Sequence, residues 1–238
     1  MKEETETLTF PGENQDNISN MKETHSGQSD DKVENLYFDI YLDAAGVERL
    51  NQIIALGKTN RYEAESRLRD LIKEYPMSPQ LRISLALIMH TPKGINGKIP
   101  VLEEAIVVDP GFFDGYRRLF QVLLGTAFRM NNAPAWERTE LDAELLSIYA
   151  VANNYPPKER HAVIAMQVAE RDSLFEPNWR STYENAVKIL NLGFARMDAS
   201  RYPAHILESY QRELDTYTNL DESKLKHLIF WFYLQWTS

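Results

Sequence analysis

The sequence contains no cysteine among its 238 residues. This absence excludes a disulfide framework, a thiolate metal site and a cysteine nucleophile. Long hydrophobic runs are missing too: the longest, Leu228 to Leu234, is far shorter than the roughly 20 residues of a membrane span. The acidic N-terminal segment has no apolar core and does not read as a secretory signal. We therefore expect a cytoplasmic protein without a membrane span.

Positive charge is in deficit, because 26 Lys and Arg face 35 Asp and Glu, for a net charge of −9. Most of the imbalance lies in residues 1–37, which carry nine acidic residues and three lysines. The nearly balanced remainder gives no reason to expect nucleic acid as a partner. The few apolar residues of the N-terminal segment follow no period, so burial cannot offset its ordering entropy. We expect residues 1–37 to form a disordered acidic tail.

Alternation with period two is rare, and the β-branched residues are thinly spread. Apolar residues recur instead at helical spacing, most clearly over 113–126, which predicts an all-α fold. Ser78 followed by Pro79 is typical of a helix start. Further helices are expected at 136–153, 179–197, 203–217 and 222–236. In the first of these four helices we expect the inward side chains to be Leu141, Leu145, Leu146, Tyr149 and Ala152.

Two helical phrases that end in proline recur 34 residues apart. The stripe Ala64, Leu68 and Leu71 closes at Pro76, and the same register gives Lys98, Leu102, Ala105 and Pro110. A fixed period of this length indicates a repeat architecture.

This pattern resembles the tetratricopeptide repeat, a helix–turn–helix unit of 34 residues. Residues 45–78 and 79–112 look like two repeats, and 113–126 like the first helix of a third. The second helix of that third repeat would follow an insertion and end at Pro156. The resemblance implies repeats over 38–156 and a helical extension over 157–238 packed on them. The motifs are degenerate, with Lys98 at a usual alanine, so an unrelated all-α bundle stays open.

The resemblance implies a concave groove lined by the first helix of each repeat. It suggests a protein–protein interaction module, adaptor-like or chaperone-like, that holds a peptide or partner protein and uses no cofactor. Three polar residues of this groove, Arg49, His90 and Arg117, are expected to contact an acidic or carboxylate-bearing peptide. The full set is Arg49, Ile53, Gln80, Ile83, Leu87, His90, Asp114, Arg117, Gln121 and Leu124.

The final helix, 222–236, is apolar nearly all the way round, which is unusual for the outer end of a stack. Two interpretations follow. The helix folds back into the body, or it pairs with a partner or a second copy. The interface residues would then be Phe230, Trp231, Tyr233 and Trp236. The second interpretation makes the protein a homo-oligomeric structural protein.

Catalytic and metal-binding patterns are weak. No two of the five histidines stand four residues apart, and no Gly-x-Ser-x-Gly motif occurs. Gly57-Lys58-Thr59 lacks the earlier glycine of a phosphate loop, and Gly57 is better explained as a helix C-cap. Residues 93–98, KGINGK, suit a turn between helices more than an anion site. A carboxylate enzyme in a helical cavity is the third hypothesis, with no catalytic pair singled out.

Overall fold

The computed structural model describes residues 39–90, 94–131 and 133–237. The expected acidic tail, 1–37, lies outside the described residues. Within them the regular structure is helical, and the strand-like pairing is one isolated β-bridge between Phe128 and Phe175. The prediction of an all-α fold is confirmed.

The described residues form ten α-helices, and the four helices expected in the second half match α7, α9, α10 and α11 to within a residue at each end. The helices are α2 (Ala44–Gly57), α3 (Arg61–Glu74), α4 (Pro79–Ile88), α5 (Ile99–Val108), α6 (Phe113–Thr126), α7 (Ala135–Asn153), α8 (Arg160–Ala169), α9 (Trp179–Arg196), α10 (Ala204–Thr218) and α11 (Glu222–Thr237). Four short 3₁₀ helices join them: η1 (Gly94–Lys98), η2 (Arg129–Asn131), η3 (Asp172–Leu174) and η4 (Ala199–Arg201).

Side-chain caps begin the first three helices. Asp43 accepts a hydrogen bond from the Gly46 N–H at 2.8 Å, and Asn60 caps α3 in the same way. Ser78 accepts from the Leu81 N–H at 3.3 Å, with Pro79 in the first turn, so the predicted start of α4 is confirmed. Such caps satisfy backbone donors that have no partner inside the helix.

The other end of α2 differs from expectation. The helix ends at Gly57, but the residue that caps it, Lys58, keeps right-handed backbone angles. Gly57 therefore supplies no left-handed C-cap, and that interpretation was wrong. Residues 94–98 of the KGINGK segment form η1, which stands between α4 and α5 in the chain, as the turn interpretation predicts, whereas Lys93 lies outside the described residues.

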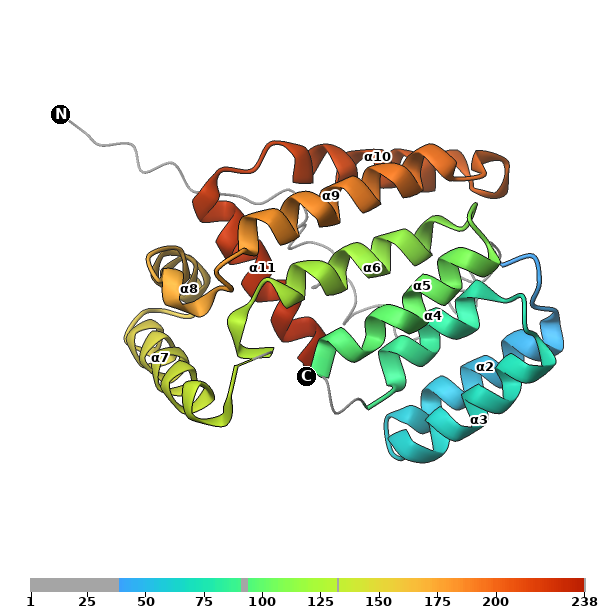
Figure 1. Cartoon of the computed structure of the whole chain (residues 1–238), viewed down its shortest axis with the longest axis horizontal. Coiled ribbons are helices and arrows are strands. Elements are labelled where there is room, and N and C mark those ends of the chain that lie inside the picture. Colours follow the sequence, from blue (N-terminus) through green and yellow to red (C-terminus); the bar gives the residue numbers. More distant parts are fainter. Residues whose placement is uncertain (1–38, 91–93, 132, 238) are drawn as a thin grey trace. The chain divides into compact units, whose positions relative to one another are not determined.

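Helices α2 to α6 form a stack in which each helix packs on the next, and α4 also touches α2 and α6 (Figure 1). The repeated stripe is the buried part of the stack. Ala64, Leu68 and Leu71 are fully buried, and so are Leu102 and Ala105. This arrangement is compatible with a helical repeat, and it explains why the apolar positions recur at a fixed interval.

The stack changes after α6. The prediction that the helix at 136–153 packs as the second helix of a third repeat was wrong, because α6 packs most extensively against α9 and then against α11. The chain leaves α6 at Phe128 and returns at Phe175, where the Glu176 N–H donates to the Ala127 carbonyl at 2.9 Å. Helices α7 and α8 lie in the chain between Phe128 and Phe175, and α9 begins shortly after Phe175.

The core is centred on α6, which lies between α9 and α5 in Figure 1, with α11 crossing behind. Phe120 contacts Tyr217 of α10 and Phe232 of α11, at ring distances of 4.7 and 6.2 Å. Tyr116 lies against Gly193, where a Cβ atom would stand 2.4 Å from the tyrosine side chain. The missing side chain of Gly193 is therefore what lets α9 approach α6 so closely.

Candidate functional site

Four of the ten expected groove residues are buried. Ile53, Ile83, Gln121 and Leu124 have at most 7% of their surface exposed. Successive first helices touch, and α9 to α11 cover much of α6, so these side chains pack inside the protein. They present no surface to a partner in this structure, which corrects their assignment as contact residues.

Asp114 and Arg117 face α10 instead of an open groove. Arg117 Nε donates to Glu213 at 2.6 Å, and the Tyr210 hydroxyl donates to Asp114 at 3.3 Å. Burial, and then the negative charge of Asp114, raises the pKa of Tyr210, which keeps the hydroxyl protonated for this bond. Helix α10 thus occupies the side of α6 that the repeat model leaves free for a ligand.

Arg49, on α2, is exposed but already paired. Its guanidinium donates two hydrogen bonds to the carboxylate of Glu74, at 2.5 and 2.6 Å. A bidentate pair of this kind leaves less of the cation free for a second carboxylate. Gln80 is half-buried at the start of α4, where its N–H donates to Asp39 at 3.1 Å.

The aromatic residues of the last helix are buried within the chain. Phe230 is 1% exposed, and Tyr233 and Trp236 are each 8% exposed, because α11 packs against α6, α8 and η1. Trp231 is half-buried beside His161 and against His227, its neighbour on α11, at ring distances of 5.2 and 5.9 Å. The helix folds back into the body, as the first of the two interpretations predicts. Its buried aromatic side chains offer little area to a second copy.

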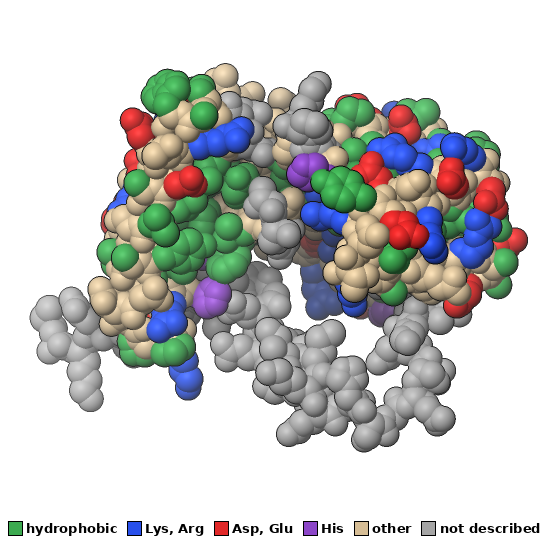
Figure 2. Space-filling view, turned by 90° about the horizontal axis from the view of Figure 1, so that it is seen from below, with side chains coloured by type: hydrophobic (Ala, Val, Ile, Leu, Met, Phe, Trp, Pro, Cys, Tyr) green, Lys and Arg blue, Asp and Glu red, His purple; other side chains and the backbone are tan. Residues whose placement is uncertain are grey.

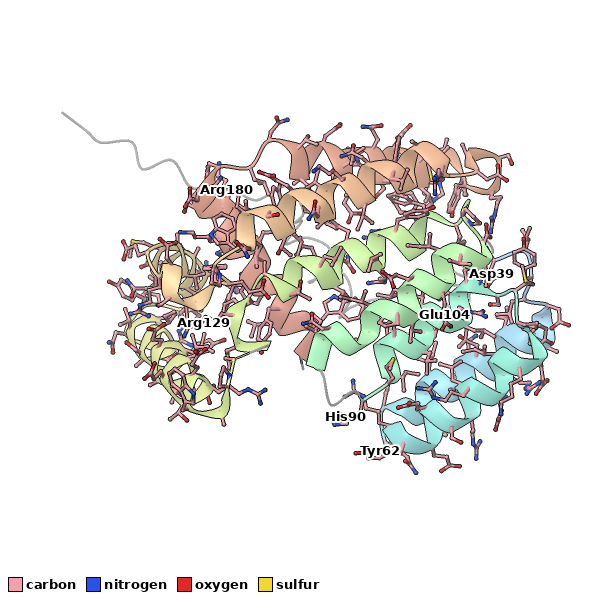
Figure 3. All side chains as sticks on the ribbon, in the orientation of Figure 1. Asp39, Tyr62, His90, Glu104, Arg129 and Arg180 are labelled. Atoms are coloured by element: carbon pink, nitrogen blue, oxygen red, sulfur yellow. The ribbon has the colours of Figure 1, made fainter. Side chains whose placement is uncertain are left out.

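Besides Arg49, two expected groove residues are exposed, Leu87 and His90, and the structure places Tyr62 and Arg61 beside them. Tyr62 is 75% exposed and meets the His90 ring edge to face at 6.4 Å (Figure 3). Arg61 Nη2 lies 3.5 Å from the Leu87 carbonyl oxygen. With Lys98, these residues form what we call the α3–α4 corner, where α3 begins and α4 ends.

Lys98 is the unusual member of the corner. It is only 6% exposed, and it stands 34 residues after Ala64, a fully buried position of the first repeat. Its ammonium group lies 3.4 Å from the Trp236 carbonyl oxygen and 5.0 Å from the centre of the Trp236 ring. Burial, and then the positive charge of Arg61, lowers the pKa of Lys98 to about 8. The sequence hint of a lysine in an alanine position thus corresponds to a buried cation.

An acidic residue that contacts this surface, Glu65, is already engaged. Glu65 accepts from Arg69 at 2.7 Å and from the His90 backbone N–H at 3.3 Å. Among the described residues, no carboxylate lies within salt-bridge distance of Arg61 or Lys98. The α3–α4 corner therefore carries uncompensated positive charge beside exposed apolar side chains, in a protein whose net charge is negative.

A second feature is a shallow depression of about 680 Å³ lined by residues of η2, α7 and the segment before α9. Its charged groups pair with each other or with neighbours. Arg129 lies 3.3 Å from Glu137, and Asp172 pairs with Lys226. Over the described ranges no group of three or more His, Asp or Glu side chains is arranged to hold a metal ion. The depression thus offers no unpaired charge to a ligand.

No protein-family model matches this sequence, and no curated protein or solved structure matches it either. In the part of the chain that the structure describes, no helix combines the length and the apolar character needed to cross a membrane.

Proposed function

We propose that the chain is a non-catalytic protein-interaction module, adaptor-like or chaperone-like, that binds an acidic peptide segment at the α3–α4 corner. One observation carries the proposal: Arg61 and Lys98 have no carboxylate partner among the described residues. Arg61 lies beside Leu87 and next to Tyr62, which are 40% and 75% exposed, and its charge acts on Lys98. A carboxylate next to an apolar side chain is the chemistry that complements this surface.

Lys98 supports the electrostatic part of the proposal. Folding lowers its pKa, so the folded state disfavours the charged form and is less stable at neutral pH than it would be with an uncharged residue. Proteins retain such residues most often at functional sites. A carboxylate bound by Arg61 would offset the positive charge that acts on Lys98 and so stabilise the ammonium group.

The apolar part of the proposal rests on Tyr62, Leu87 and His90. Tyrosine and arginine are enriched among residues that dominate binding energies, because they combine a large contact area with hydrogen-bonding groups. Tyr62 and His90 already pack edge to face, which limits the freedom that a ligand would have to remove. We expect the ligand to place a leucine or an aromatic residue here.

The non-catalytic part of the proposal is supported by the carboxyl groups whose pKa departs from its usual value. Asp43, Glu74, Asp198, Asp221 and Glu222 are all shifted downward, chiefly by hydrogen bonds from neighbouring backbone or side-chain donors. Lowered values suit caps and salt bridges, whereas a general acid near neutral pH needs a raised value.

The test uses an array of immobilised peptides of about 12 residues, in which the number of Asp and Glu around a central Leu or Phe is varied. The best binder is then labelled and titrated by fluorescence anisotropy. We expect affinity to rise with carboxylate count and Arg61→Ala to weaken it at least about tenfold, or about 1.4 kcal/mol. Arg196→Ala, at an exposed arginine of α9, is the matched control and should bind like the wild type.

Two results would contradict the proposal. One is an array on which acidic peptides bind no better than their lysine-substituted counterparts. The other is equal loss of affinity in Arg61→Ala and Arg196→Ala, which would show that net charge, and not the α3–α4 corner, governs binding.

A further inference from the structure

Helix α7 has an outer face that nothing in the described chain covers. Its buried residues, Leu141, Ile148 and Ala152, lie on the opposite side, and its packing partners are α8 and η2. On the outer side Leu146 is 68% exposed and Trp136 is 65% exposed. In Figure 2, hydrophobic side chains gather over the left part of the view, where α7 and α8 lie, whereas charged side chains dominate the right part.

The outer face follows a regular register. Positions that alternate by three and four residues along α7 are all exposed, and none of them is charged: Trp136, Thr139, Ala143, Leu146, Ala150 and Asn153. The five charged residues of α7, Glu137, Arg138, Glu140, Asp142 and Glu144, all lie off this stripe. Alternating steps of three and four residues are the spacing of the contact positions along the seam of a two-helix coiled coil.

We propose that this stripe is a self-association face, on which two copies of the chain pair through antiparallel α7 helices. A two-fold axis between Ala143 and Leu146 places each Leu146 opposite the small Ala143 of the second copy. The same axis places Thr139 opposite Ala150. Each larger side chain then meets a smaller one, so the stripe is complementary to itself.

The charges agree with an antiparallel pair. This register places Glu140 opposite Tyr149 and Asp142 opposite Ser147 of the second copy, so no carboxylate faces a carboxylate. A parallel pair would place Leu146 opposite Leu146 and Glu140 opposite Glu140, which is worse for both packing and charge. Antiparallel helices also set their dipoles in the favourable relative direction.

The available area sets the strength of the dimer. A helix of 19 residues is about 28 Å long, so α7 alone buries a few hundred Å² on each copy, about half of a standard interface. An interface of this size lies at the small end of the range, where weak and transient contacts are found, so we expect a reversible dimer.

The first test is sedimentation velocity of the full chain from about 1 to about 200 µM, a range that brackets a micromolar dissociation constant. We expect a concentration-dependent shift from monomer to dimer in the wild type. Leu146→Arg should remain monomeric with an unchanged helical circular dichroism spectrum. Leu192→Arg, at a 44% exposed leucine of α9, is the matched control and should dimerise like the wild type.

The second test uses the absence of cysteine, since any disulfide must then come from introduced residues. Ala143→Cys and Leu146→Cys chains are mixed and oxidised. Antiparallel pairing predicts a mixed disulfide between the two variants, whereas parallel pairing predicts disulfides within each variant. A monomeric wild type over the whole range, or a Leu146→Arg variant that dimerises normally, would overturn the proposal.

Discussion

Replacing Gly193 by alanine tests the packing of α9 on α6. A Cβ atom at this position would stand 2.4 Å from both Cβ and Cγ of Tyr116, which belong to the base of the side chain and cannot swing away. Overpacking of this kind costs about 1–3 kcal/mol. Alanine in a helix interior recovers about 0.5–1 kcal/mol relative to glycine. We expect a net loss of about 1–2 kcal/mol, or roughly 2–8 °C in Tm for a chain of this size.

Gly57→Ala is the matched control, because a Cβ there would meet its nearest neighbours at 3.7 Å, an ordinary contact distance. This variant should be as stable as the wild type or more stable by up to about 1 kcal/mol. Thermal and urea unfolding, followed by circular dichroism, measure both variants. A Gly193→Ala protein that is as stable as Gly57→Ala would refute the close approach of α9 to Tyr116, and with it the corrected order of helices around α6.

Three further predictions concern buried polar groups. Lys98→Met should raise the free energy of unfolding at pH 7 by about 2–3 kcal/mol, because folding lowers the lysine pKa from about 10.5 to about 8. The difference between variant and wild type should vanish as pH rises from 8 to 10.5, because the wild-type lysine loses its charge in both states. A difference that does not change with pH would contradict this prediction. Burial, and then the charge of His161, lowers the pKa of His227 to about 4. Wild-type stability should therefore fall as pH drops from 6.5 to 4, by up to about 3 kcal/mol more than that of His227→Gln, in urea titrations across this window; parallel curves would argue against a buried neutral imidazole. Asp39 is 3% exposed and accepts three hydrogen bonds, two of them from the start of α4. Asp39→Ala should lower the free energy of unfolding by about 2–4 kcal/mol in urea titrations. A loss below about 0.5 kcal/mol would show that water replaces these hydrogen bonds.

Local signals predicted the helices well. Ser78-Pro79 marks the start of α4, and the 34-residue register identified buried positions such as Leu68 and Leu102. These signals act within a few residues of the chain or between adjacent repeats. They do not specify which distant helix packs beside α6, since α7 and α9 both carry enough apolar residues to fill that place. The deciding contact, between Phe128 and Phe175, joins residues far apart in sequence.

The direction of each helix face was harder to predict. Leu146 and Tyr149 were expected to face inward but are 68% and 38% exposed, because α7 carries apolar residues on both sides. The expected groove failed for a similar reason: α10 covers Arg117 through Glu213, a contact that no local pattern announces. Of the α3–α4 corner, His90 and Leu87 were expected, whereas Arg61 and Tyr62 were not.

Lys98 gave the one usable hint of the missed part of the site. A lysine in a position where the first repeat buries alanine is a conflict between the pattern and the residue. Such conflicts are expected at functional or strained positions. The sequence showed the conflict, and the structure showed that the conflict lies beside Arg61.

Isothermal titration calorimetry of the best acidic peptide, at pH 8 in buffers of different ionisation enthalpy, tests the central claim most directly. At this pH Lys98 is about half protonated, and a carboxylate bound at Arg61 restores its pKa toward the usual value. The account predicts uptake of up to about half a proton per peptide by the wild type, and none by Lys98→Met. Binding without proton uptake, or equal uptake by both proteins, would contradict it.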